Sequence, residues 1–112
     1  MQNTAILLQA KSNFDSSDGD LMQKLQACEK SVLLDVSAVE QTQAHTINLL
    51  VNVHERLRKY GQTLTLISPS ACIRTWLYVT KLQQVIPVFS NLLIANAYVQ
   101  QIQKQDHPKS HS

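Results

Sequence analysis

The amino-acid sequence predicts a single-domain α/β fold in which about four strands alternate with four helices and the central sheet is mostly parallel. Two observations predict this class. Short apolar runs alternate along the chain with longer segments whose apolar residues recur at helical spacing. One run, residues 32–36, is apolar on both sides of its pleat, which is typical of a strand covered on both faces. The pattern leaves the direction of the N-terminal strand open.

Length and composition limit the classes of protein. A chain of 112 residues accommodates one domain with one modest core. We expect the domain to occupy residues 1–104 and residues 105–112 to form a disordered C-terminal tail. The net charge of +2 is too small for a phosphate-binding surface, so a protein partner is favoured and nucleic acid is not expected.

The cysteines and the apolar runs indicate the compartment. Cys28 and Cys72 stand alone, which fits reduced thiols better than a disulfide framework. The first residues lack a basic segment followed by a long apolar one, so no secretory signal is expected. No apolar run approaches the roughly 18 residues of a spanning helix. We therefore expect a cytoplasmic protein without direct membrane insertion.

The first elements are a strand over residues 5–8, a turn-forming stretch over 11–20 and a helix from Leu21 to about residue 29. The stretch before the helix does not fit a calcium loop, because counting from Asp15 places Gly19 at position 5 instead of 6. Capping of the helix by Asp18 or Asp20 is the preferred interpretation.

The central segment is a buried strand over 32–36, a polar loop over 37–42 and a helix from about Gln43 that ends before Gly61. Arg56, Arg58 and Lys59 lie in the last turns, where positive charge complements the helix dipole. Gly61 can supply the left-handed residue that ends a helix. The apolar positions expected to pack on the sheet are Ile47, Leu50, Val51 and Leu57.

The last elements are a strand over 63–67, a helix, an edge strand and a fourth helix. Ser68 and Pro69 predict the start of the third helix, with Ser68 as the N-cap. Pro87 places the strand over 85–89 at a sheet edge. The expected inner stripe of the third helix is Ile73, Trp76, Leu77 and Thr80. The fourth helix, capped by Ser90 or Asn91, is expected to carry Leu92, Leu93, Ala95, Val99 and Ile102.

The candidate site is the loop after the second strand, because sites in parallel sheets collect at the carboxyl ends of strands. The sequence contains two glycines and no HExxH pattern, so nucleotide-binding loops, a metal site and any cofactor are not expected. The absence of a catalytic motif indicates a protein that is not an enzyme. The residues predicted to bind a protein partner are Thr42, Gln43, His45, Thr46, Asn48 and Asn52.

Several local patterns occur in the order found in one known family. They are Leu34-Asp35-Val36-Ser37-Ala38-Val39, the helix end Leu57-Arg58-Lys59-Tyr60-Gly61, and Thr63-Leu64-Thr65-Leu66-Ile67-Ser68-Pro69. Over residues 32–89 the chain resembles a STAS domain of the bacterial anti-sigma factor antagonist type. The resemblance implies a regulatory interaction module whose partner is an anti-sigma factor of the switch-kinase type or another STAS protein.

One departure from the family pattern concerns regulation. The family motif D-S-S-G falls on Gln43, Ala44, His45 and Thr46, so the serine that partner kinases phosphorylate in many members is His45 here. Three interpretations follow: drift in a copy that no longer switches, a constitutive binding surface, or a switch moved to Thr42 or Thr46. The resemblance also allows an alternative role as a STAS accessory subunit of a lipid-transport ABC system, with the transporter ATPase as partner. A flavodoxin-like enzyme is disfavoured by the scarcity of glycine.

Overall fold

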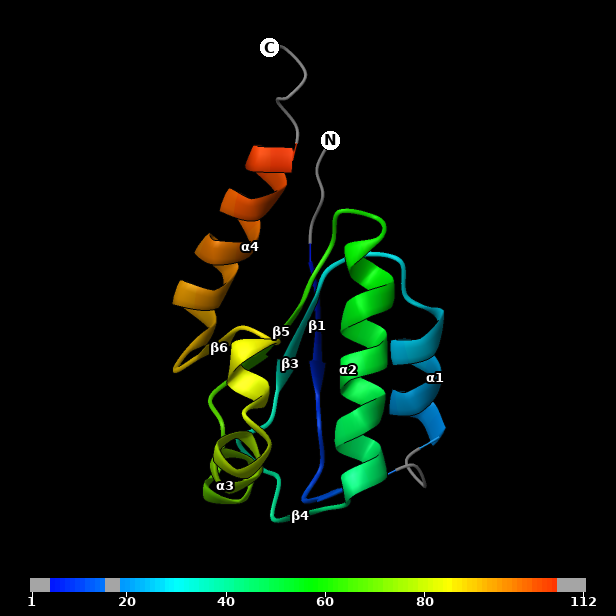
Figure 1. Ribbon diagram of the computed structural model, residues 1–112, viewed down its shortest axis with the longest axis vertical. Helices are drawn as coiled ribbons and strands as arrows, with labels where there is room; N and C mark the ends of the chain where they lie inside the picture. Colours follow the sequence, from blue (N-terminus) through cyan, green and yellow to red (C-terminus); the bar gives the residue numbers. More distant parts are fainter. Residues whose placement is uncertain (1–4, 16–18, 107–112) are drawn as a thin grey trace.

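The computed structural model describes residues 5–15 and 19–106 (Figure 1). The strands are β1 (Ile6–Gln9), β2 (Asn13–Phe14), β3 (Val32–Asp35), β4 (Gln41–Thr42), β5 (Leu64–Ile67) and β6 (Val88–Phe89). The helices are α1 (Gly19–Ala27), α2 (Ala44–Arg58), α3 (Ala71–Thr80), the short 3-10 helix η1 (Leu82–Gln84) and α4 (Leu92–Asp106).

The main sheet has four strands in the order β1-β3-β5-β6, and every neighbouring pair is parallel. The predicted α/β class with four helices and a mostly parallel sheet is confirmed, and the open direction of the first strand is resolved as parallel. The short strands β2 and β4 form a separate parallel pair. The predicted edge position of the strand near Pro87 is confirmed, although β6 begins only after this proline.

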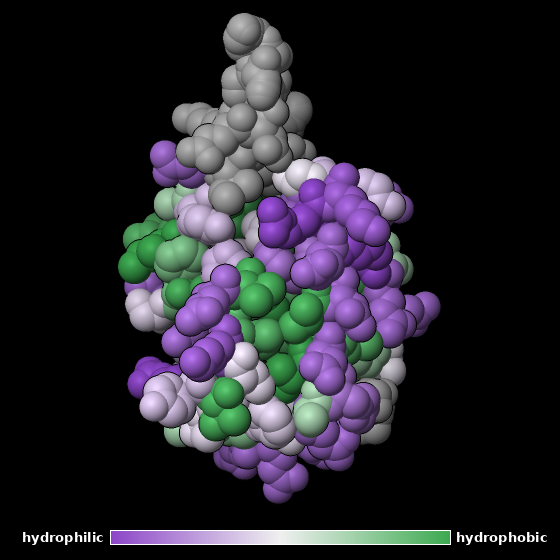
Figure 2. Space-filling model, in the orientation of Figure 1, coloured by the Kyte–Doolittle hydropathy of each residue, from purple (hydrophilic) through white to green (hydrophobic). Residues whose placement is uncertain are grey.

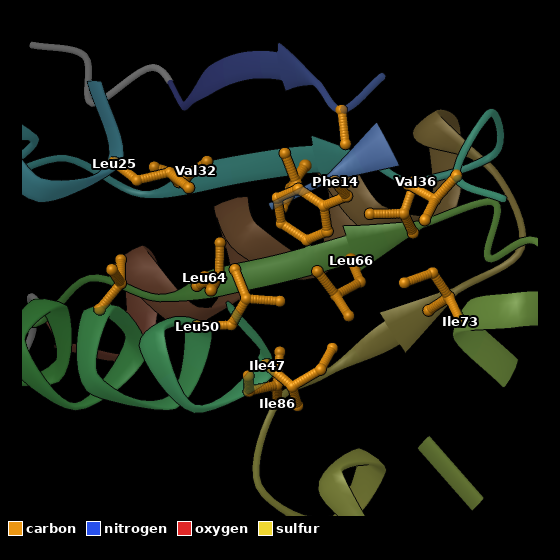
Figure 3. Packing of buried hydrophobic residues seen from close by; sticks show 14 of the residues in the cluster. Phe14, Leu25, Val32, Val36, Ile47, Leu50, Leu64, Leu66, Ile73 and Ile86 are labelled. Atoms are coloured by element: carbon orange, nitrogen blue, oxygen red, sulfur yellow. The ribbon is translucent and has the colours of Figure 1, made fainter. Parts of the chain in front are cut away.

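Helices cover both faces of the sheet (Figure 1), with α1 and α2 on one side and α4 on the other. The side chains of β3 alternate between two apolar clusters: Val32 and Leu34 belong to the larger cluster, and Leu33 packs in the smaller one with Ala95 and Val99 of α4. Figure 3 shows part of the larger cluster, with side chains of the strands and of α2 pointing toward one another. The two-sided burial predicted for this strand is confirmed.

The apolar stripe of α2 follows the predicted spacing. Ile47, Leu50 and Leu57 are buried, whereas Val51 lies at the margin and is partly exposed. The helix ends at Arg58, and Gly61 supplies the predicted left-handed residue after it, with a φ of 73°. The N–H groups of Gly61 and Gln62 donate to the carbonyl oxygens of Arg58 and Leu57, an arrangement that satisfies the last carbonyls of the helix.

The predicted cap of α3 is wrong, and one of the two caps predicted for α1 is excluded. Asp20 lies inside α1, where it forms an ion pair with Lys24 at 3.4 Å, so it is not the cap. Asp18, the other predicted cap, lies outside the described residues. The N-cap of α3 is Ser70 instead of Ser68, and the Ser70 Oγ accepts a hydrogen bond from the Ile73 N–H at 3.2 Å. The chain turns sharply at Ser68, whose φ is 53°.

The inner faces of the last two helices also differ from the prediction. Thr80 of α3 is exposed, because this helix packs through Ile73 and Leu77, with Cys72 and Trp76 at the margin. Leu92 and Leu93 are 43% and 80% exposed, so the packed face of α4 is formed by Ala95 and Val99 and not by these two leucines. Asn91 caps this helix, as predicted, by accepting a hydrogen bond from the Ile94 N–H at 2.9 Å. α4 continues through residues 105 and 106, and the remainder of the predicted tail lies outside the described residues.

Candidate functional site

The loop between β3 and α2 lies at the carboxyl ends of the parallel strands, at the lower end of Figure 1. Its first residues are fixed by hydrogen bonds. The Asp35 Oδ1 accepts from the Ser37 N–H at 2.9 Å, which shapes the turn out of the strand. The Val36 carbonyl accepts from the Ser70 N–H at 3.3 Å, which holds the start of α3 against the same turn.

The second half of the loop is held by the segment that follows β1. The Ser12 carbonyl accepts hydrogen bonds from the Glu40 and Gln41 N–H groups at 2.7 and 2.9 Å. Directly afterwards, β4 pairs with β2, and Val39 is buried at 1% exposure. The backbone that leads into α2 is therefore positioned from both sides before the helix begins.

The first turn of α2 has no acidic residue. The N-cap, Gln43, has extended backbone geometry and its side chain makes no capping hydrogen bond. The carbonyl of Gln43 accepts from the Thr46 and Ile47 N–H groups at 3.0 and 3.1 Å, so the helix begins without a side-chain cap. The partial positive charge of the helix start consequently has no acidic side chain on its own first turn to offset it.

Four of the predicted site residues are exposed at the start of α2 and along its first turns. Gln43, His45, Asn48 and Asn52 are all exposed. Positions 45, 48 and 52 are separated by three and four residues, a spacing that aligns them along one face of the helix. We refer to His45, Asn48 and Asn52 together with the N-cap Gln43 as the α2 polar strip. It offers hydrogen-bond donors and acceptors without a formal carboxylate.

The two threonines lie differently. Thr46 is 1% exposed and Thr42 is partly buried, and the hydroxyl oxygen of each is buried without a hydrogen-bond partner among the described residues. Contrary to the expectation from the sequence, Thr46 contributes no side-chain surface for a partner. Its hydroxyl is also inaccessible to a kinase in this conformation, and the same holds for the Thr42 hydroxyl.

Sequence reasoning missed a hollow of about 370 Å³ beside the loop, at the ends of β5 and β6. The Ser68 Oγ donates to the Ser90 carbonyl at 3.1 Å across it, and Arg74 lies at its margin. The residue that could have indicated this hollow in the sequence was Ser68, which the sequence pattern predicts to be a helix cap. Within residues 5–15 and 19–106, no three His, Cys, Asp or Glu side chains lie close enough to hold a metal ion.

The comparisons agree on the fold. A model of the STAS domain family matches residues 11–94. A crystal structure from Thermotoga maritima, assigned as an anti-sigma factor antagonist, superposes with a TM-score of 0.65 at 20% identity, covering 89% of this chain and 84% of that one. An anti-sigma factor antagonist (STAS) domain protein from Planctomyces limnophilus superposes with a TM-score of 0.62 at 25% identity, covering 73% of this chain and 72% of that one. No curated protein matches the chain. None of the helices in the described part is long and apolar enough to cross a membrane.

Proposed function

The chain belongs to the STAS domain family, and we propose that it is a non-enzymatic regulatory module that binds a partner protein through the α2 polar strip and the loop before it. The observation that carries this proposal is the strip itself. It is a continuous exposed face of hydrogen-bonding side chains, at the carboxyl ends of the strands, on a backbone fixed from both sides. Loops and helix starts on a rigid scaffold are where binding residues concentrate in such folds.

We further propose that the partner is an anti-sigma factor. Both solved structures reported above carry the name anti-sigma factor antagonist, and this chain shares their fold over most of its length. Their names support this partner class for the present chain. The exposed α2 polar strip provides a surface that such a partner can bind. The proposed complex requires no cofactor, because the strip binds through side-chain hydrogen bonds alone.

The surface is proposed to be constitutive. His45 occupies the place of the second serine of the family motif, and its imidazole is not an acceptor for a serine kinase. The hydroxyls of Thr42 and Thr46, the alternative acceptors, are buried. A phosphate near the start of α2 would meet the positive end of the helix dipole and change the charge of the strip by about −2. Without an accessible acceptor at positions 42, 45 and 46, the strip receives no phosphate at these positions and keeps the form that a partner recognises.

Site-specific crosslinking in the native host tests the partner surface. A photoreactive amino acid at Asn48 or Asn52 should crosslink one and the same protein, to be identified by mass spectrometry. The matched control is the same amino acid at Asn96, an exposed asparagine on α4. Equal crosslinking from Asn96, or none from Asn48 and Asn52, contradicts the proposal. A transporter ATPase as the captured protein would replace the anti-sigma factor with the alternative partner.

Measurements of the affinity for the captured protein then test how the size and the charge of the strip side chains affect binding. Asn48→Arg should weaken binding of the captured protein at least tenfold, because a bulky cation replaces a small amide in the middle of the strip. Asn96→Arg makes the same change on α4 and should leave the affinity unchanged. His45→Asp should weaken binding and His45→Asn should retain it, since only the first brings the negative charge that a phosphate would bring. Equal affinities for all four variants would remove the strip from the interface.

A further inference from the structure

Within residues 5–15 and 19–106, the outer edge of the sheet at β1 is an open strand. In this part of the chain β1 is the terminal strand in the order β1-β3-β5-β6 and pairs with β3 alone in the main sheet. The N–H groups of Ile6 and Ala10 donate to the Ser31 and Asp35 carbonyls of the β3 side at 2.8 and 2.9 Å. Because the hydrogen-bonding direction alternates along a strand, the backbone groups of Leu7 and Gln9 point away from β3. These groups can pair with a further strand.

The side chains of this edge are also apolar and accessible. Ile6 and Leu7 are 38% and 48% exposed. A hollow of about 670 Å³ runs between β1 and the end of α1, and its apolar lining includes Ile6, Leu8 and Ala27. Exposed edge strands are usually protected by a charge, a proline or a bulge. Residues 5–10, Ala-Ile-Leu-Leu-Gln-Ala, contain no charge and no proline, whereas the opposite edge strand β6 is only two residues long and follows Pro87.

We propose that β1 pairs antiparallel with β1 of a second copy of this chain, which joins two four-stranded sheets into one continuous sheet. The pairing is centred on Leu7, which lies opposite Leu7 of the other copy and exchanges both backbone hydrogen bonds with it. Ile6 then lies opposite Leu8 of the other copy, on the face of the sheet where both residues line the hollow beside α1. A two-fold axis makes this interface self-complementary and closed, so it ends at the dimer.

The charges around the edge favour a second copy over a charged partner. Glu29 and Lys30 lie near the beginning of β1, next to Ser31, and Lys11 and Asp20 lie near its end. Antiparallel pairing places the beginning of one strand beside the end of the other. Glu29 and Lys30 of one copy therefore come to lie on the side of Lys11 and the Asp20–Lys24 ion pair of the other copy. The charges at the two ends of β1 are therefore complementary between the two copies.

The dimer extends the proposed function without depending on it. Because the two sheets run antiparallel, the carboxyl ends of their strands point in opposite directions. The two α2 polar strips consequently lie at opposite ends of the dimer, and each remains accessible. The family model matches residues 11–94, so β1 lies outside the matched region. The proposed partner binding therefore does not require the dimer.

Sedimentation equilibrium of the purified full chain tests the proposal. The wild-type protein should sediment as two chains at high concentration and dissociate on dilution to one chain of 12.6 kDa. Leu7→Lys should sediment as one chain, because the two-fold axis brings the two lysines together. Leu7→Glu should do the same for the same reason. An equimolar mixture of the two variants should recover the mass of two chains, since lysine then faces glutamate.

The control is Leu93→Lys, which makes the same substitution at a leucine that is 80% exposed on α4 and should leave the dimer intact. A second measurement needs no variant. Hydrogen exchange at the Leu7 and Gln9 amides should slow as protein concentration rises, whereas the Ile6 amide, already bonded to β3, should not change. A wild-type protein that stays monomeric at millimolar concentration overturns the proposal. A dimer that persists in Leu7→Lys also overturns it.

Discussion

The Nδ1 atom of His54 accepts a hydrogen bond from the backbone N–H of Leu64 at 3.2 Å. His54 is 4% exposed, and it also hydrogen-bonds the backbone of Val85. The imidazole thus joins α2 to the first residue of β5 and to the segment that leads into β6. Because Nδ1 is an acceptor, the neutral ring carries its proton on Nε2, and protonation of Nδ1 breaks the bond to Leu64.

This geometry predicts a loss of stability in mild acid. Burial lowers the pKa of His54, and the positive charge of Arg58 lowers it further, against weaker opposing effects of Glu55 and the Val85 bond. The unfolded chain therefore takes up the proton first as the pH falls. The His54 contribution should be complete above about pH 6.5, the ordinary histidine pKa, and should decline from there down to the lowered folded-state pKa.

Thermal unfolding between pH 8 and pH 5 measures this effect. His54→Gln should flatten the pH dependence of Tm, because the titrating group is gone. His45→Gln, at the exposed histidine of the same helix, should retain the wild-type dependence. Identical slopes for wild type and His54→Gln would show that another group causes the acid sensitivity.

Arg56 caps the end of a neighbouring helix instead of its own. Its guanidinium donates to the carbonyl oxygens of Gln26, Leu25 and Cys28 at 2.6, 2.7 and 2.8 Å, at the carboxyl end of α1. Arg56→Met keeps most of the aliphatic stem and removes the donors, so it should lower the free energy of unfolding by about 1.5–3 kcal/mol. Urea unfolding checks this, with the exposed Lys59→Met as a control expected to change it by less than about 0.5 kcal/mol. If Arg56→Met and Lys59→Met lower the free energy of unfolding equally, Arg56 does not stabilise the end of α1.

Leu50 is the centre of the packing of α2 on the sheet. It is fully buried in the larger apolar cluster (Figure 3), so Leu50→Ala should lower the free energy of unfolding by about 2–5 kcal/mol. Leu93→Ala removes the same atoms from a side chain that is 80% exposed and should cost less than about 0.5 kcal/mol. A thermal midpoint unchanged by Leu50→Ala would contradict the packing of this helix.

Substitutions at the start of α3 test whether Ser70 or Ser68 is the N-cap of this helix. Ser70→Ala removes the oxygen that accepts from the Ile73 N–H and should lower the free energy of unfolding by about 1 kcal/mol. Ser70→Asp keeps an acceptor at this position and should retain the stability. If Ser70→Ala unfolds at the wild-type urea concentration while Ser68→Ala does not, the cap is Ser68.

The buried Thr46 hydroxyl predicts an unusual neutral substitution. Its Oγ has no hydrogen-bond partner among the described residues, so Thr46→Val replaces an unsatisfied oxygen with a methyl group of similar size. Calorimetry should show an unchanged or higher Tm. Thr75→Val, which removes the bond from the Thr75 Oγ to the Ala71 carbonyl at 3.1 Å, provides the comparison for a satisfied threonine. A Tm for Thr46→Val that falls by several degrees would indicate a bond that the hydroxyl makes.

Figure 2 shows that polar side chains surround an apolar area at the centre of this face of the molecule. Apolar surface of this kind remains at the margins between helices and strands. The spacing of apolar residues in the sequence predicts which face of a helix is apolar, but it does not determine how much of that face the neighbouring elements cover. Leu92 and Leu93 are an example. The sequence predicts both on the packed face of α4, yet both are exposed, whereas Ala95 and Val99 of the same helix are buried with Leu33 and Ile67 of the sheet.

The sequence by itself determined the order of the four main strands and the four α-helices, the two-sided burial of β3, the packed stripe of α2 and the role of Gly61 at the end of that helix. These features follow from side-chain periodicity and backbone chemistry, which act over a few residues. The exposed positions of the α2 polar strip follow from the same periodicity, since they occupy the face opposite the apolar stripe.

Only the tertiary structure decided which serine caps α3, which carbonyls Arg56 reaches, and that Thr46 is buried while His45 beside it is exposed. It also decided that β1 is parallel to β3 and that, among the described residues, no strand pairs with its other side. Arg56 and Leu25 are 31 positions apart, as are Ser31 and Gln62, whose side chains bond at 2.8 Å. Such contacts depend on how whole elements dock, and no pattern within a few residues of either partner specifies them.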